Sequence, residues 1–317
     1  MKTRSKSKPH PHAALPDAGS GSLISDARLV ELYTAMLRCR MLRDRIRALR
    51  RPAKLRRFAS VSEAVAAAAT IGLLPEDAVI SSAPDLCAAM LKGVPLESIL
   101  RAVCARPSNK HSSNGADSSL IASGVLHASL AGARHLDVAA GAAFAGKRSN
   151  RAPVAVSFFE DAAAKDSSHS TFDFALAHEL PLIFVRQAAR PFQTASRRGK
   201  SSRRSAFPPG SLPIIPVDSN DAVAVYRVAH EAIAHARRGS GPTLIDCVPL
   251  RLAGERKQDS DCIARMERYL EAKGLRPERI KAGLAARFAR VMDNAVAAAR
   301  SNPRASRQVR RSAKAGK

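Results

Sequence analysis

The chain has 317 residues and carries 52 lysines and arginines against 27 acidic residues, which gives a formal net charge of +25. Its hydrophobic fraction is 45%, and no stretch approaches the roughly 18 to 20 consecutive apolar residues of a membrane-spanning helix, so a membrane protein is excluded. The basic N-terminus lacks the apolar segment of a secretory signal. We therefore expect a cytoplasmic protein with one large α/β domain.

The five cysteines form no Cys-x-x-Cys pair and do not cluster with histidines in a ligand-like pattern. They are Cys39, Cys87, Cys104, Cys247 and Cys262. Neither a zinc site nor a disulfide framework is expected from this spacing. The sequence predicts buried free thiols.

The first third of the chain has mostly helical patterning. Residues 26–51 place apolar side chains at three- and four-residue spacing, which predicts a long amphipathic helix with Ser25 or Asp26 at its start. The elements expected next are a helix at 62–73, a strand at 78–81, helices at 84–92 and 95–104, and a loop at 105–120. We expect these helices to form an N-terminal helical segment.

From residue 134 onward, helices alternate with short apolar runs. The expected elements are helix 135–147, strand 153–159, helix 169–179, strand 181–185, strand 213–217, helix 221–238, strand 243–248 and helices at 259–273 and 276–300. Continuous apolar strands separated by helices are typical of a parallel sheet buried on both faces. The fold class is therefore α/β, with three layers and a mainly parallel sheet.

Basic residues concentrate in three tracts. Four basic residues in positions 2–8 and six in positions 304–317 have no acidic neighbour. This composition predicts disordered tails at residues 1–24 and 301–317 around a folded body at 25–300. A third tract runs from Arg186 to Arg204. Such tracts attract polyanions, so nonspecific polyanion contact is expected, but with only 4% aromatic residues a base-stacking surface is not.

Several segments resemble the alpha subunit of thiamine-diphosphate-dependent 2-oxo acid dehydrogenases of the pyruvate dehydrogenase type. The matching segments are LVELYTAMLRCRMLRDR, SEAVAAAATIGLLPEDAVISS, MLKGVPLESIL and VDSNDAVAVYRVAHEAIAHARRGSGPTLID. They occur in the family's order and together cover roughly residues 26–300. The resemblance implies a thiamine-diphosphate-binding fold, a beta subunit or a second copy as partner, and thiamine diphosphate held through Mg²⁺ as cofactor.

The motifs that hold the cofactor in this family are altered here. The family anchors the diphosphate and Mg²⁺ with a Gly-Asp-Gly turn after one strand and a pair of asparagines after the next. By resemblance, Glu160, Asp161 and Ala162 occupy the first turn, so only the aspartate remains as a weak metal-ligand candidate. Ala188 occupies an asparagine position in the second turn. We expect weakened binding of magnesium and diphosphate.

Two further family positions are also altered. Asp85 is the only residue kept from a Tyr-Arg-Asp-His-Gly-His segment, and Glu255 occupies the position of a histidine beside the active-site entrance. No catalytic residue is therefore assigned with conviction. His169 and His178 lie near acidic residues but lack the spacing of a zinc-binding motif, so they are interpreted as polar residues on a helix surface.

Three functions follow from the sequence. The first is a non-catalytic, alpha-subunit-like protein with impaired or lost cofactor binding that acts as a structural or regulatory subunit. The second is an active 2-oxo acid dehydrogenase alpha subunit that works with a beta subunit. The third is a polyanion-binding protein on the same scaffold. The sequence favours the first, because the structural segments are kept while the cofactor motifs are not.

Overall fold

The computed structural model describes residues 24–50, 62–81, 86–104, 124–127, 134–149, 153–160, 168–188, 212–250 and 261–301. The strands are β1 (Ala78–Ser81), β2 (Val125–His127), β3 (Ala155–Glu160), β4 (Leu182–Gln187), β5 (Ile214–Asp218) and β6 (Thr243–Val248). The helices are α1 (Asp26–Arg50), α2 (Glu63–Thr70), α3 (Leu86–Leu91), α4 (Leu96–Cys104), α6 (Arg134–Arg148), α7 (Ser168–Ala177), α8 (Ala222–Arg237), α9 (Cys262–Ala272) and α10 (Pro277–Ser301).

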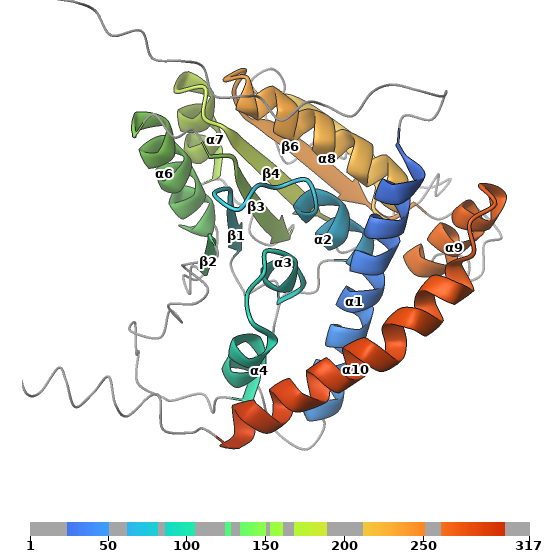
Figure 1. The fold of residues 1–317 in the computed structure, drawn as a ribbon. Helices are drawn as coiled ribbons and strands as arrows, with labels where there is room; N and C mark the ends of the chain where they lie inside the picture. The colour runs from blue at the N-terminus through green and yellow to red at the C-terminus, as the bar shows by residue number, and fades with distance from the viewer. Residues whose placement is uncertain are drawn as a thin grey trace, which may run out of the picture.

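The strands form a six-stranded sheet in the order β2-β1-β3-β4-β6-β5, and every pairing between described strands is parallel. Helices cover both faces, with α6 and α7 on one side and α1, α2 and α8 on the other (Figure 1). The central strands β3 and β4 are buried over most of their length. The expected three-layer α/β arrangement with a parallel sheet is confirmed.

Alternate side chains of the central strands pack into two hydrophobic clusters, one on each face of the sheet. Val156 and Phe158 pack with α1 and α2, whereas Phe159 and Phe184 pack with α6 and α7. Successive side chains of a strand point to opposite faces, so a strand with helices on both sides is apolar at most positions, and in β3 the one buried polar residue is Ser157. The continuous apolar runs in the sequence are the direct result of this double burial.

Helix α2 lies in the middle of one helical layer, and all eight of its residues are buried. Its sequence EAVAAAAT consists largely of alanine. Such small side chains allow helix backbones to approach closely, and α2 contacts both α1 and α8. The helix begins at Ser62, whose side-chain oxygen accepts a hydrogen bond from the Val65 backbone N–H at 3.3 Å.

Three details differ from the sequence-based expectations. Strand β2 was not predicted, because three residues are too few to show a strand period and residues 125–127 gain their pairing from β1. Glu160 and Arg186 were expected in turns, yet both belong to strands. The ladder continues through the Phe159↔Arg186, Glu160↔Gln187 and Arg186↔Asp246 pairs, because neighbouring parallel strands supply the backbone partners.

The predicted buried thiols are confirmed for Cys39, Cys87, Cys247 and Cys262, which are buried and form no disulfide among the described residues; Cys104 ends α4 and its side chain lies outside the described residues. Among the described residues, no helix is long and apolar enough to cross a membrane. The predicted basic tails, the loop at 105–120 and most of the basic tract 186–204 also lie outside the described residues.

Candidate functional site

The strand order places a topological switch point between β1 and β3. The chain leaves β1 toward β2 on one side of the sheet, and leaves β3 toward β4 on the other. In open parallel sheets, ligands bind in the crevice outside the carboxyl ends of the strands at such a point. The residues that end β1 and β3, Ser81 and Glu160, therefore mark the candidate site.

Glu160 lies at the carboxyl end of β3 and is exposed. It is in register with Gln187, the last residue of β4, so two polar residues end adjacent strands. Within the described residues, Glu160 forms no ion pair. A carboxylate without a cationic partner thus stands at the position where the family resemblance places the first glycine of the diphosphate turn.

The end of β4 is already engaged in hydrogen bonds. The side-chain oxygen of Gln187 accepts a hydrogen bond from the backbone N–H of Ser62 at 2.8 Å, which connects the start of α2 to the sheet edge. The backbone N–H of Ala188 donates to the Cys247 carbonyl oxygen at 2.9 Å. The side chain of Ala188 is a methyl group, so it offers no oxygen to a metal ion.

Arg186 and Asp246 form a two-point ion pair between β4 and β6. The Arg186 Nε lies 2.8 Å from Asp246 Oδ1, and its Nη2 lies 2.5 Å from Oδ2. Both side chains are about one-sixth exposed, at 17% and 16%. Bidentate pairs of this kind are strong and fix geometry, so the pair stabilises the carboxyl edge of the sheet.

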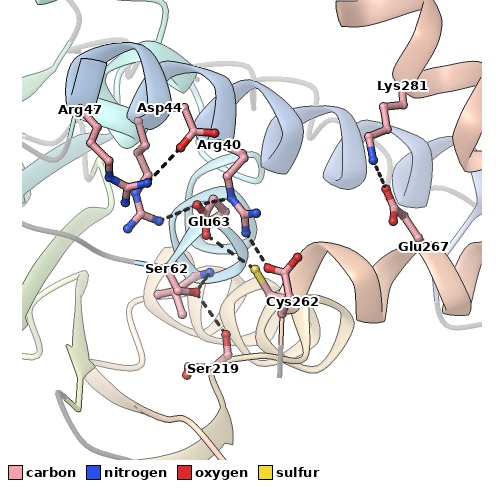
Figure 2. Close-up of polar contacts among 12 residues, drawn as sticks. Arg40, Asp44, Arg47, Ser62, Glu63, Ser219, Cys262, Glu267 and Lys281 are labelled. Carbon is pink, nitrogen blue, oxygen red and sulfur yellow. Dashed lines mark hydrogen bonds and ion pairs between the residues drawn. The ribbon is translucent and has the colours of Figure 1, made fainter. Parts of the chain in front are cut away.

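A charged cluster lies where α1, α2 and α9 meet (Figure 2). Glu63 is only 6% exposed, and its Oε1 lies 2.8 Å from Arg40 Nε and 2.7 Å from Arg43 Nη1. Arg40 also pairs with Asp261 at 2.6 Å. Burial opposes ionisation of Glu63, but the hydrogen bond from Arg40 and the charge of Arg43 outweigh it, so the pKa of Glu63 is lowered.

Cys262 lies at the edge of the same cluster and donates a hydrogen bond from its thiol to Glu63 Oε2 at 3.7 Å. Burial, together with the negative charge of Glu63, raises the pKa of Cys262 to about 12. Burial likewise raises the pKa of Cys247. The nucleophile of cysteine chemistry is the thiolate, so neither group is suited to covalent catalysis.

The VDSND segment, the most specific part of the resemblance, forms a turn between β5 and α8. Asp218 accepts hydrogen bonds from the backbone N–H groups of Asn220 at 3.0 Å and Leu250 at 3.1 Å. Asp221 accepts from Ala224 N–H at 3.0 Å and caps α8. Arg265 of α9 pairs with both aspartates. These contacts give both aspartates a structural role in shaping the turn and starting α8.

The predicted site residues are only partly brought together. Glu160 and Ala188 lie at the ends of adjacent strands, as expected from the two motifs. Asp161, Ala162, Asp85 and Glu255 lie outside the described residues.

His169 lies in α7, and His178 directly follows the last residue of this helix, Ala177. The His178 ring packs against Phe144 at 5.1 Å and Phe174 at 4.5 Å between centroids, and in the described part of the chain no group of three or more potential ligands is arranged for a metal ion. The sequence-based interpretation of His178 as a residue of the helix surface agrees with this environment.

The charged cluster around Glu63 was not predicted from the sequence. The signals available were the Ser62-Glu63 start of a helix and the basic residues Arg40 and Arg43 on a neighbouring helix. Neither signal identifies the partner, because Asp261 is 221 residues from Arg40 along the chain. These residues come together only through the packing of α1, α2 and α9.

The described donors at the strand ends do not match an anchor for magnesium and diphosphate. Mg²⁺ takes oxygen ligands in near-octahedral geometry. Here the side chain of Ala188 is a methyl group, and the side-chain oxygen of Gln187 accepts a hydrogen bond from Ser62. Glu160 carries a negative charge at a position where the family has glycine, which has no side chain. Among the described residues at these two strand ends, the side chains therefore differ from the glycine and asparagine that the family resemblance places there.

The chain is similar to known proteins over most of its length. The model of the family Dehydrogenase E1 component matches residues 33–307. The alpha subunit of acetoin:2,6-dichlorophenolindophenol oxidoreductase from Bacillus subtilis is 27% identical over 251 residues, which cover 76% of this chain and 75% of that protein. The pyruvate dehydrogenase E1 component subunit alpha of Staphylococcus aureus is 29% identical over 279 residues, covering 80% and 72%.

The pyruvate dehydrogenase E1 component subunit alpha-3 of rice chloroplasts is 28% identical over 272 residues, and the match covers 80% of this chain but 64% of the rice protein. Among solved structures, transketolase from Leishmania mexicana is similar with a TM-score of 0.43 and 12% identity. That match covers 85% of this chain and 46% of the transketolase chain.

Proposed function

The chain belongs to the dehydrogenase E1 component family, and from this premise we propose that it is a non-catalytic, alpha-subunit-like protein. It keeps the family scaffold, has lost effective binding of thiamine diphosphate, and acts as a structural or regulatory subunit. Its partner is a dehydrogenase beta subunit or a second copy of the chain. Thiamine diphosphate, when bound in an active relative, supplies the carbanion chemistry that no protein side chain provides.

The observation that carries this proposal is the pair of strand ends at Glu160 and Ala188. They end adjacent parallel strands, at the edge where this type of sheet binds ligands. A carboxylate about 4 Å from a phosphate charge costs roughly 1 kcal/mol in water and about 4 kcal/mol at the effective permittivity near a protein surface. Glu160 therefore opposes the diphosphate, while Ala188 removes a ligand from the metal that would offset this charge.

Hydrogen bonds and an ion pair connect the helices and strands around the altered positions. The fold is therefore kept without the cofactor, which supports a structural or regulatory role. Ser62 is bonded to Gln187 at 2.8 Å, and Arg186 to Asp246 at 2.5 Å. The Ser62 hydroxyl also donates to the Ser219 carbonyl at 3.2 Å (Figure 2). These contacts tie α2, β4, β6 and the turn after β5 together without any group from a cofactor.

A reconstitution assay tests the proposal. The full chain is co-expressed with a dehydrogenase beta subunit from the same organism, and the purified mixture is supplied with thiamine diphosphate, Mg²⁺ and a panel of 2-oxo acids. Reduction of 2,6-dichlorophenolindophenol reports turnover, and the Staphylococcus aureus alpha subunit with its own beta subunit is the positive control. We expect a folded protein and no turnover above background. Turnover within about tenfold of the control would refute the proposal.

A further inference from the structure

The outer side of α10 carries two pairs of arginines. Arg276, which directly precedes the helix, and Arg279 are three residues apart, and Arg287 and Arg290 form a second such pair 11 residues further along. Arg276 continues the helical pattern, since its carbonyl accepts a hydrogen bond from Ile280 N–H at 3.5 Å. At 3.6 residues per turn, all four fall within an arc of about 80°. We call this set the α10 arginine stripe.

The stripe is exposed, and Glu271 and Glu278 line the same surface pocket as its first pair, Arg276 and Arg279. All four side chains are exposed, and among the described residues none of them has an ion-pair partner. Two other cations nearby are ion-paired: Lys281 pairs with Glu267 at 3.1 Å (Figure 2), and Arg265 pairs with two aspartates.

The acidic residues of α10 do not interrupt the stripe. Asp293 pairs with Arg45 of α1 at 2.6 Å, so its charge is already used. Glu278 lies about 140° around the helix from the centre of the stripe, on its other side. Nine basic and four acidic residues occupy 262–301, and four of the nine basic residues form the stripe.

The apolar side of α10 is already occupied. Ala295, Val296 and Ala299 are buried in a cluster with residues of α1 and α4. A helix that binds a membrane surface inserts a broad apolar face, whereas Val291, 52% exposed, is the one large apolar side chain of α10 that is exposed among the described residues. Proteins that bind single strands use aromatic side chains for stacking, whereas the stripe contains only arginine, with Gly283 and Ala286 between the two pairs.

The spacing of the two pairs fits a duplex. Eleven residues of α-helix span about 16 Å, and the major groove of B-DNA is about 12 Å wide, so the two arginine pairs are far enough apart to contact phosphates on opposite rims. Figure 1 shows α10 along the outer edge of the molecule, with its outer side free of other described elements. We infer that the α10 arginine stripe binds the phosphate backbone of double-stranded nucleic acid.

The overall charge agrees with this partner. The chain carries +25, and residues 302–317, which follow α10 directly, contain six further basic residues and no acidic one. Phosphate contacts are independent of base sequence and supply most nonspecific affinity. The inference does not depend on the fate of the cofactor site, because α10 and the carboxyl edge of the sheet share no residue.

Fluorescence anisotropy with a labelled 20-base-pair DNA duplex of arbitrary sequence tests the inference on the full chain. The variant Arg279→Gln/Arg287→Gln/Arg290→Gln removes three charges from the stripe. The matched control removes three exposed arginines of α1, α6 and α8 that form no ion pair among the described residues: Arg38→Gln/Arg148→Gln/Arg227→Gln. Both variants keep the chain ends, so the comparison isolates the stripe. Unchanged circular dichroism shows that each variant remains folded.

We expect the unaltered chain to bind the duplex at low salt. The stripe variant should lose at least about tenfold in affinity. The slope of log K against log salt should fall in magnitude by about 0.9 for each lost phosphate contact. The control variant should lose clearly less. Equal loss in both variants, no binding by the unaltered chain at low salt, or tighter binding of the single strand would overturn the inference. So would binding to phosphatidylglycerol vesicles with the same dependence on the stripe.

Discussion

Gln187 accepts a hydrogen bond from the backbone N–H of Ser62 at 2.8 Å, across 125 residues of sequence. This contact joins the last residue of β4 to the residue that caps α2. Because the first N–H groups of a helix lack partners within the helix, the bond satisfies a donor that would otherwise need water. It also uses the side-chain oxygen next to Ala188, at the edge where the family resemblance places the metal ligands.

Replacing Gln187 should weaken the fold through this one bond. The substitution Gln187→Met keeps the size of the side chain and removes the acceptor, so we expect a loss of about 1 kcal/mol in the free energy of unfolding. The matched control is Glu160→Gln at the adjacent strand end, where the side chain is exposed and forms no ion pair with any residue that the structure describes. It should change stability by less than about 0.5 kcal/mol. Urea denaturation measures both, and an unaffected Gln187→Met variant would contradict the account.

Glu63 should make the fold sensitive to acid. Arg40 and Arg43 lower its pKa in the folded state, so the folded protein binds fewer protons than the unfolded chain. Stability from this group is therefore fully present above its ordinary pKa of about 4.3 and is lost as the pH falls through the lower folded value. The midpoint of urea denaturation, followed from pH 7 down to pH 3, should decline over this acidic window.

The variant Glu63→Gln separates this effect from the titration of other carboxylates. It removes the charge that faces Arg40 and Arg43, so we expect a loss of about 1 to 3 kcal/mol at pH 7, given that both arginines are partly exposed. Below the pH at which Glu63 is protonated, the variant and the parent should converge. A constant difference between the two at every pH would show that the ionised form of Glu63 contributes nothing.

Gly124 should tolerate no side chain. Its φ is +69°, and a Cβ built there would lie 2.6 Å from the backbone oxygen of Asp77. Asp77 is fixed by hydrogen bonds from Val154 and Leu74, so its backbone has little room to move. We expect Gly124→Ala to cost about 3 kcal/mol, combining the left-handed conformation with overpacking.

Gly239 provides the control for this substitution. Its φ is +79°, but a Cβ there would meet nothing within 4 Å. The variant Gly239→Ala should therefore lose only the roughly 1 kcal/mol due to the backbone conformation. Thermal denaturation of both variants separates the two contributions. Equal losses would mean that the contact with Asp77 relaxes at no cost.

Much of the fold could be predicted from the sequence because its signals are local. The expected strands 78–81 and 243–248 coincide with β1 and β6, and the long helix expected at 26–51 is α1. Their apolar periods are long or continuous enough to be distinctive. Strand β2 was missed, since a three-residue edge strand has no period of its own and depends on pairing with β1.

The side-chain contacts at the candidate site could not be predicted in the same way. The Arg186–Asp246 pair joins residues 60 apart, and Arg40 reaches Asp261 across 221 residues. No local pattern identifies such partners, because they are set by the order of strands and the packing of helices. The altered turns at Glu160 and Ala188 were recognised only because the family resemblance supplied the residues expected there.

The most direct test of the proposed function is calorimetric titration of magnesium thiamine diphosphate into the full chain and into a restored variant, each with the beta subunit present. The variant Glu160→Gly/Ala162→Gly/Ala188→Asn returns three of the altered family positions. We predict no detectable heat for the unaltered chain, and binding improved by at least about tenfold, worth roughly 1.4 kcal/mol, for the restored variant. Micromolar binding by the unaltered chain would contradict the loss of the cofactor and restore catalysis as its function.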